Sequence, residues 1–377
     1  MTAALPSTST PYRPGRALAG HVVRQVRLGA VVVAAVAAGM SALVAGQYQT
    51  TFAGVLDGSA VQALAANPAI RILFGPPLAL DDPGGFTVWR TGIPVLVLVS
   101  VLSLLAATRI TRGEEDAGRS DLLLAGCVRR RDLITGALIA VAVAVVVIAA
   151  LVAVALTAAG TQFAGALVHA GSVLGIGLTF SAVGTLAAQI MATRAAAAGL
   201  AAAVLGGGLL ARMLADGVPG SGWLAWSTPF GLAGLAAPYA GNRVEPLVVL
   251  AAFPAVLTVA TVVVAGHRDA GSGVINSSAS RRSRTRLLRS VTGFAVRRAT
   301  AHTAAWAGGI AAYFLLVGAL VSSILTFLAD NPRFTELAAG AGLRAARHRA
   351  RTGRGGFQPP RHPGRALRRD PHGHDGR

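Results

Sequence analysis

The chain has 377 residues, of which 53% are hydrophobic and 13% charged, and its formal net charge is +19. Soluble globular domains carry about 25% charged residues, so this composition excludes an ordinary soluble domain and indicates a membrane protein. The chain contains no lysine. A phosphate-binding loop of the form GxxxxGK[ST] requires one, so the sequence excludes that ATP site, and the chain is not expected to be an enzyme itself.

Seven apolar segments are long enough to cross a hydrocarbon core of about 30 Å as helices. We expect an all-α polytopic helical membrane protein with spans at 28–46, 92–108, 134–158, 167–191, 195–214, 246–265 and 304–328. The polar N-terminal segment lacks the charged stretch followed directly by an apolar stretch that a cleaved signal peptide requires. The first span is therefore expected to be retained.

Arginines gather beside the apolar segments, as the positive-inside rule requires of cytoplasmic loops. The first cluster, before the first span, comprises Arg13, Arg16, Arg24 and Arg27. This cluster predicts a cytoplasmic N-terminus. With alternating spans, 109–133 and the basic linker then lie in the cytoplasm, whereas 47–91 and 215–245 lie outside. We interpret the positive charge as a determinant of topology and expect no nucleic acid as a partner.

The same pattern predicts the domain organisation. The expected parts are a cytoplasmic N-terminus at 1–27, a six-span repeat at 28–265, a basic cytoplasmic linker at 266–303, the start of a second repeat at 304–342 and an Arg-rich tail at 343–377. The second repeat is suggested by LAANP at 64–68 and LADNP at 328–332. The tail lacks apolar periodicity and is expected to be disordered. An arm that binds nucleic acid or anionic lipid is the functional alternative, and a shifted reading frame or a tail with no selected role is the interpretation we favour.

The spans show no series of carboxylates or cations like those of proton-driven pumps. His169 is the candidate for a proton relay, and an interfacial histidine hydrogen-bonded to backbone is the interpretation we favour. Gly171 and Gly175 have the GxxxG spacing that permits close helix approach, although in so glycine-rich a chain it indicates no particular contact. No nucleophile with a base and no HExxH motif lies within the spans, so no catalytic, cofactor or metal site is expected.

One charged stretch, RITRGEEDAGRSDLLLAGCVRRRDL at 109–133, stands between two apolar segments and holds five of the fifteen acidic residues. Thr111 and Glu114 have the spacing of a capping box, and Gly126 is suited to end a helix, which predicts a short amphipathic helix at the cytoplasmic surface. The single cysteine, Cys127, is expected to be a small, semi-buried residue. Because carboxylates contribute little to orientation, they suggest a partner; a solvated, salt-bridged face is the equally open alternative.

This stretch is similar to the cytoplasmic loop after the second span of type-2 ABC transporter permeases, in particular the actinobacterial group of polyketide-antibiotic exporters. That group shows R-x-EE-x-x-GR-x-E-L-L, and the matching residues here are Arg112, Glu114, Glu115, Gly118, Arg119, Asp121, Leu122 and Leu123. A second stretch, WLAWSTPFGLAGLAAPYAGNRVEPL at 223–247, resembles the outer loop before the sixth span in that group. Its matching residues are Trp226, Ser227, Pro229, Gly231, Pro238, Arg243, Pro246 and Leu247, with Thr228 inserted.

In that family the first loop forms the coupling helix, which docks on a separate ATPase subunit. The resemblance therefore implies that the first set of residues meets an ABC ATP-binding subunit. It also implies a permease in the bacterial plasma membrane that exports hydrophobic small molecules such as antibiotics. Members usually carry twice six spans, so a C-terminally truncated or frameshifted chain would pair with a second copy as a homodimer. A non-transporting membrane anchor or sensor that docks a cytoplasmic partner is the alternative.

Overall fold

The computed structural model describes residues 14–49, 68–119, 125, 130–218 and 220–266, with scattered positions between 290 and 318. Six helices of the described part are long and apolar enough to span a membrane, and the same part contains no β-strand. They belong to α1 (Pro14–Gln47), α4 (Pro83–Ile110), α7 (Arg130–Ala158), α8 (Phe163–Ile190), α9 (Arg194–Gly217) and α11 (Glu245–Gly266). The protein is thus an all-α polytopic membrane protein, and the first six predicted spans are confirmed. Most of the seventh, 304–328, lies outside the described residues.

All six spanning helices begin earlier than predicted, and the difference is largest for α4 and α1. α4 begins at Pro83 instead of 92, because the Asp82 carboxylate accepts hydrogen bonds from the amides of Gly84 at 2.7 Å and Gly85 at 2.9 Å. An aspartate N-cap followed by proline is a strong helix start. α1 already begins at Pro14, inside the segment predicted as a separate N-terminus.

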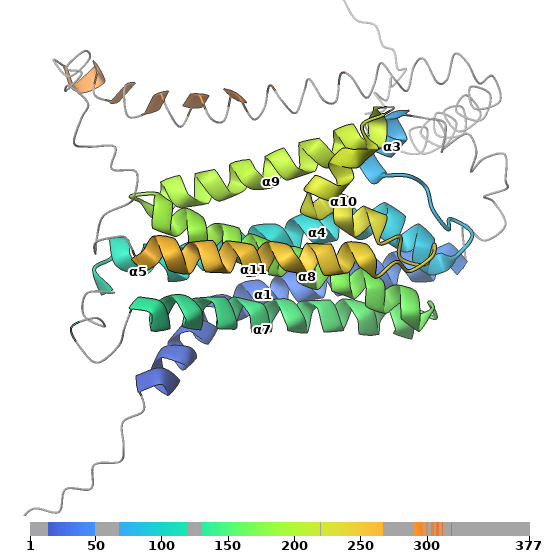
Figure 1. Cartoon of the computed structure of the whole chain (residues 1–377), viewed down its shortest axis with the longest axis horizontal. Helices are drawn as coiled ribbons and strands as arrows, with labels where there is room; N and C mark the ends of the chain where they lie inside the picture. Colours follow the sequence, from blue (N-terminus) through green and yellow to red (C-terminus); the bar gives the residue numbers. More distant parts are fainter. Residues whose placement is uncertain are drawn as a thin grey trace, which may run out of the picture. The chain divides into compact units, whose positions relative to one another are not determined.

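Four short helices connect the long ones: α3 (Pro68–Phe74), α5 (Arg112–Asp116), the 3-10 helix η2 (Gly222–Ser227) and α10 (Pro229–Leu235). Figure 1 shows α5 at one end of the long helices and α3 toward the other. We call these the α5 end and the α3 end. The long helices run alternately between the two ends, as expected for consecutive spans.

The core is organised around α8. Within its spanning segment 78% of the residues are buried, compared with 11% for α11, and α8 packs against α4, α7, α9 and α11. Phe180, Ile176 and Val173 are among its fully or almost fully buried side chains. α11 instead exposes Val248, Val256 and Val259, as expected of a helix that faces lipid.

Glycines allow α8 to approach its neighbours closely. A Cβ atom placed on Gly171 would lie 3.1 Å from Leu247 Cδ1, and one on Gly175 would lie 2.6 Å from Leu250 Cδ2, both on α11. The GxxxG spacing therefore marks the contact between α8 and α11, which the sequence alone did not assign.

A larger side chain at Gly184 is expected to separate α8 from α4. Its Cβ would lie 2.9 Å from the carbonyl oxygen of Leu104 and 3.0 Å from Ala107 Cβ. Because a backbone atom cannot rotate away, we expect Gly184→Leu to lower the free energy of unfolding by about 1–3 kcal/mol. Thermal unfolding of the purified protein in detergent measures this. Gly199→Leu is the matched control, since nothing lies within 4 Å of its Cβ position; equal unfolding temperatures for the two variants would contradict the packing.

Candidate functional site: the charged α5 segment and the α10 loop

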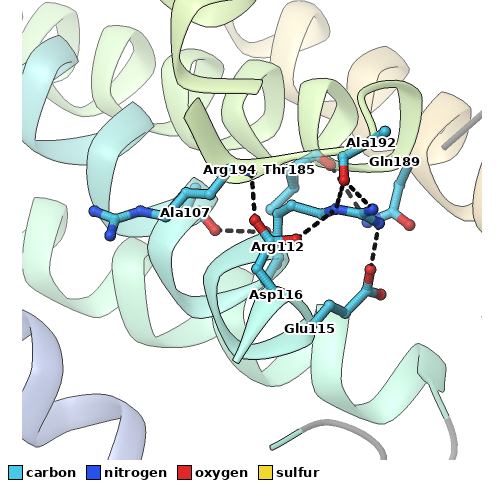
Figure 2. A network of polar contacts seen from close by, with 9 residues as sticks. Ala107, Arg112, Glu115, Asp116, Thr185, Gln189, Ala192 and Arg194 are labelled. Carbon is cyan, nitrogen blue, oxygen red and sulfur yellow. Dashed lines mark hydrogen bonds and ion pairs between the residues drawn. The ribbon is translucent and has the colours of Figure 1, made fainter. Parts of the chain in front are cut away.

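Arg112, the first residue of α5, is a buried arginine with 2% of its surface exposed. Its Nε donates to the carbonyl oxygen of Ala192 at 3.0 Å and lies 3.2 Å from Asp116 Oδ1. Its Nη1 lies 2.6 Å from Glu115 Oε2, and its Nη2 also donates to Ala192 (Figure 2). Ala192 belongs to the turn between α8 and α9. One guanidinium therefore ties α5 to that turn.

Asp116 makes a second link to the same turn. Its Oδ2 accepts a hydrogen bond of 2.7 Å from the backbone amide of Arg194, the first residue of α9 (Figure 2). A carboxylate at this position is stabilised by the positive end of the helix dipole. Thr193, the N-cap of α9, accepts a bond of 3.2 Å from the amide of Ala196. The start of α9 is thus held by both its own cap and α5.

Glu114 connects α5 to α1. Its carboxylate accepts a hydrogen bond of 2.9 Å from Gln25 Nε2 on α1. It also forms a bidentate pair with Arg119, with Nε at 2.6 Å and Nη2 at 2.9 Å. This hydrogen-bonded pair raises the pKa of Arg119 above its usual value. We call the linked side chains the α5 cluster: Arg112, Glu114, Glu115, Asp116 and Arg119.

The capping box predicted from Thr111 and Glu114 is wrong. Thr111 forms no side-chain cap on α5, and its hydroxyl instead donates to the carbonyl oxygen of Ala107, 2.6 Å away in α4. α5 ends before Gly118, and Gly126, which was predicted to end the helix, lies outside the described residues. Gly118 has φ = +70°, and a glycine adopts this left-handed conformation at little cost.

The members of the predicted docking set differ in exposure. The side chains of Arg112, Glu114 and Glu115 are 3%, 13% and 17% exposed, whereas that of Arg119 is 56% exposed. The sequence left open that these charges form a solvated, salt-bridged face. The α5 cluster is not fully solvated, because three of its five charged side chains are largely buried. The remaining members, Asp121, Leu122 and Leu123, lie outside the described residues, as do Gly126 and Cys127.

The second predicted motif forms η2 and α10 at the opposite end of the bundle. Thr228, the residue inserted relative to the family pattern, is the N-cap of α10, and its Oγ1 accepts a bond of 2.9 Å from the amide of Gly231. A Cβ atom on Gly231 would lie 2.3 Å from the carbonyl oxygen of Ala225, so glycine is required there. Pro229 occupies the first turn, and Trp226 is 48% exposed.

The turn after α10 contacts the turn that precedes α8. The hydroxyl of Tyr239 lies 2.9 Å from Thr161 Oγ1, and its backbone amide donates to Asn242 Oδ1 at 2.9 Å. Burial raises the pKa of the Tyr239 phenol. Arg243 is exposed, and its backbone amide bonds to the α10 end, whereas Pro246 is buried at the start of α11. The structure thus brings the motif residues together in one loop system.

An ion pair on α9 was not predicted from the sequence. Arg212, only 4% exposed, places its Nε 2.6 Å from Asp216 Oδ2, and its Nη1 donates to the carbonyl oxygens of Ile72 and Leu73 at 3.3 Å each. Arg212 lies inside the predicted span 195–214. The Arg/Asp spacing of four residues, which places both side chains on one helix face, was the signal that could have revealed the pair.

Comparison with known proteins agrees with this architecture. No protein-family model matches the chain. It is 31% identical over 273 residues to the multidrug efflux system permease protein Rv1217c of Mycobacterium tuberculosis. The matched region covers 72% of this chain and 49% of that protein, so the chain spans about half the length of the curated relative it matches.

Proposed function

We propose that the chain is the membrane-spanning permease subunit of an ABC exporter in the bacterial plasma membrane. It would move hydrophobic small molecules such as antibiotics or drugs out of the cell, with ATP hydrolysis supplied by a separate ATP-binding subunit. The observation that carries this proposal is the 31% identity to a multidrug efflux permease. The six apolar helices, of which α8 is the most buried, support it. Alternating access, in which the partner's ATP cycle shifts the population of two arrangements of the helices, is the proposed mechanism.

The α5 end is proposed to face the cytoplasm and to dock the ATP-binding subunit. The docking set then divides by role. Arg112, Glu114 and Glu115, whose side chains are largely buried, hold α5 to α1 and to the α8–α9 turn. Gly118 and Arg119 are exposed, and with Asp121, Leu122 and Leu123 they would provide the contact surface.

Hydrogen bonds made by the charged residues of α5 connect this docking surface to the spanning helices. A force on α5 reaches the start of α9 through Asp116 and the turn before it through Arg112. It reaches α1 through Glu114 and Gln25. Breaking a hydrogen bond to a charged group is costly, so we propose that α1, α5 and the α8–α9 turn move together when the partner moves.

The single cysteine of the chain offers a direct test of docking. A maleimide photo-crosslinker attached to Cys127, within the docking stretch, is expected to capture a co-expressed ATP-binding subunit in isolated membranes. Arg119→Ala is expected to reduce the crosslinked yield severalfold, because it removes the exposed charge that lies before the predicted contact residues. The yield is measured by densitometry after gel electrophoresis.

Two controls make this experiment specific. Cys127→Ser must abolish the crosslink. Arg243→Ala removes an exposed arginine from the opposite end of the bundle and must leave the yield unchanged. Docking at α5 is contradicted if Arg119→Ala and Arg243→Ala give the same yield as the unaltered chain.

A further inference from the structure

A pocket of about 260 Å³ lies between α3, α4, α8, α9 and α10 toward the α3 end. Its walls are mostly apolar and include the rings of Phe74, Trp89 and Phe230. The Phe74 and Trp89 ring centroids are 5.1 Å apart, and Trp89 Nε1 donates to the carbonyl oxygen of Gly75 at 3.2 Å. This aromatic wall is therefore fixed before any ligand arrives, which reduces the entropy lost on binding.

His169 of α8 lines this pocket and is only 2% exposed. Among the described residues, nothing forms a hydrogen bond with its imidazole, and its ring nitrogens are not among the fully buried atoms that lack a partner. The predicted hydrogen bond from this histidine to backbone is therefore wrong, and the ring nitrogens are accessible from the pocket that the residue lines. Neutral imidazole can donate one hydrogen bond and accept another. A ligand with a hydroxyl or carbonyl group would supply the partner.

The charged groups that line the pocket do not require a ligand of opposite charge. Arg212 is neutralised by Asp216 at 2.6 Å, and its remaining bonds go to the carbonyls of Ile72 and Leu73. Arg243 also lines the pocket and is exposed, so water screens its charge. The buried part of the pocket thus offers aromatic surface and one unsatisfied imidazole.

We propose that this pocket binds an uncharged aromatic ring system that carries a hydroxyl or carbonyl group. The ring lies against the wall formed by Phe74 and Trp89, and the polar atom bonds to His169. Because about 260 Å³ is slightly less than the roughly 300–1,000 Å³ usual for pockets of drug-sized ligands, the site holds a small aromatic molecule or one part of a larger one. Only the further step, that the ligand is a transported substrate, rests on the proposed function.

The test compares radiolabelled 1-naphthol and naphthalene, which share a ring system and differ in one hydroxyl. Saturable binding is measured on the full chain in lipid nanodiscs, with empty nanodiscs subtracted for partition into lipid. One hydrogen bond to a buried group predicts that 1-naphthol binds about 3–10-fold more tightly. His169→Leu removes an unpaired polar group and should leave the fold intact, but it is expected to abolish this preference. An unchanged preference in His169→Leu overturns the proposal.

A second pair of variants tests the location independently of His169. Gly234 lines the pocket and Gly207 does not, and nothing lies within 4 Å of the Cβ position of either. Gly234→Phe is expected to abolish saturable binding of both compounds, whereas Gly207→Phe should retain it. Retained binding in Gly234→Phe overturns the site. The binding experiment contains no ATP-binding subunit, so absence of naphthol binding would overturn the pocket proposal without contradicting the proposed function. Conversely, absence of drug-stimulated ATP hydrolysis would contradict the proposed function without contradicting a measured naphthol site.

Discussion

Arg112→Ala is expected to lower the free energy of unfolding by about 3–5 kcal/mol, the usual effect of removing one partner of a buried ion pair. The guanidinium is 3% exposed and serves Glu115, Asp116 and the carbonyl oxygen of Ala192 together. Without it, two carboxylates and one carbonyl oxygen lose the contacts that the guanidinium makes with them. Arg112→Lys should recover only part of the loss, because an ammonium group lacks the planar fork that reaches all three acceptors.

Thermal unfolding of the purified chain in detergent measures this effect. Arg109→Ala is the matched control, because Arg109 is exposed, lies within the last turn of α4 and makes no hydrogen bond or ion pair with any described residue. Its stability should change by less than about 0.5 kcal/mol. If Arg109→Ala and Arg112→Ala unfold at the same temperature, the α5 cluster does not hold the segment to the bundle.

Breaking the ion pair on α9 should lower the free energy of unfolding by a similar amount, but here a second substitution should restore most of the loss. Arg212→Leu leaves Asp216, whose side chain is 19% exposed, without its 2.6 Å partner, and we expect a loss of about 3–5 kcal/mol. Replacing both residues with leucine should restore most of that loss, since an apolar pair of similar volume avoids the cost of burying charge. The recovery should be incomplete, because the carbonyls of Ile72 and Leu73 still lose their donor.

A double-mutant cycle of Arg212→Leu and Asp216→Leu, followed by thermal unfolding, isolates the coupling between the two side chains. Additive losses would show that the pair is not coupled and would contradict this account of the α3 end.

Hydropathy sufficed to predict the six spans, because their length and composition are set by the thickness of the bilayer. The orientation predicted from the arginines stays a prediction. The start of α4 was predicted too late although its signal is local, since Asp82 caps the helix immediately before Pro83. The capping box failed because Thr111 bonds backward into α4. Local spacing could not distinguish these alternatives.

The hydrogen-bond partners of the charged α5 residues could not be predicted from the sequence. Arg112 bonds to Ala192, 80 positions away, and Glu114 bonds to Gln25, 89 positions away. Such pairings depend on how α1, α5 and α8 pack. The pocket is assembled from five separate helices and could not be read from any one of them, although His169 was recognised as unusual within an apolar span. Arg212 was overlooked although it lies within a predicted span.

The central claim is that the chain couples a hydrophobic substrate to ATP hydrolysis by a partner. The most direct measurement is ATP hydrolysis by the chain and its co-purified ATP-binding subunit in nanodiscs, titrated with a panel of hydrophobic antibiotics. We expect at least one compound to raise the rate severalfold and saturably, and we expect Arg119→Ala to reduce that stimulation. A stable complex whose hydrolysis rate is the same at every concentration of every compound would contradict the account and would indicate a membrane anchor or sensor instead.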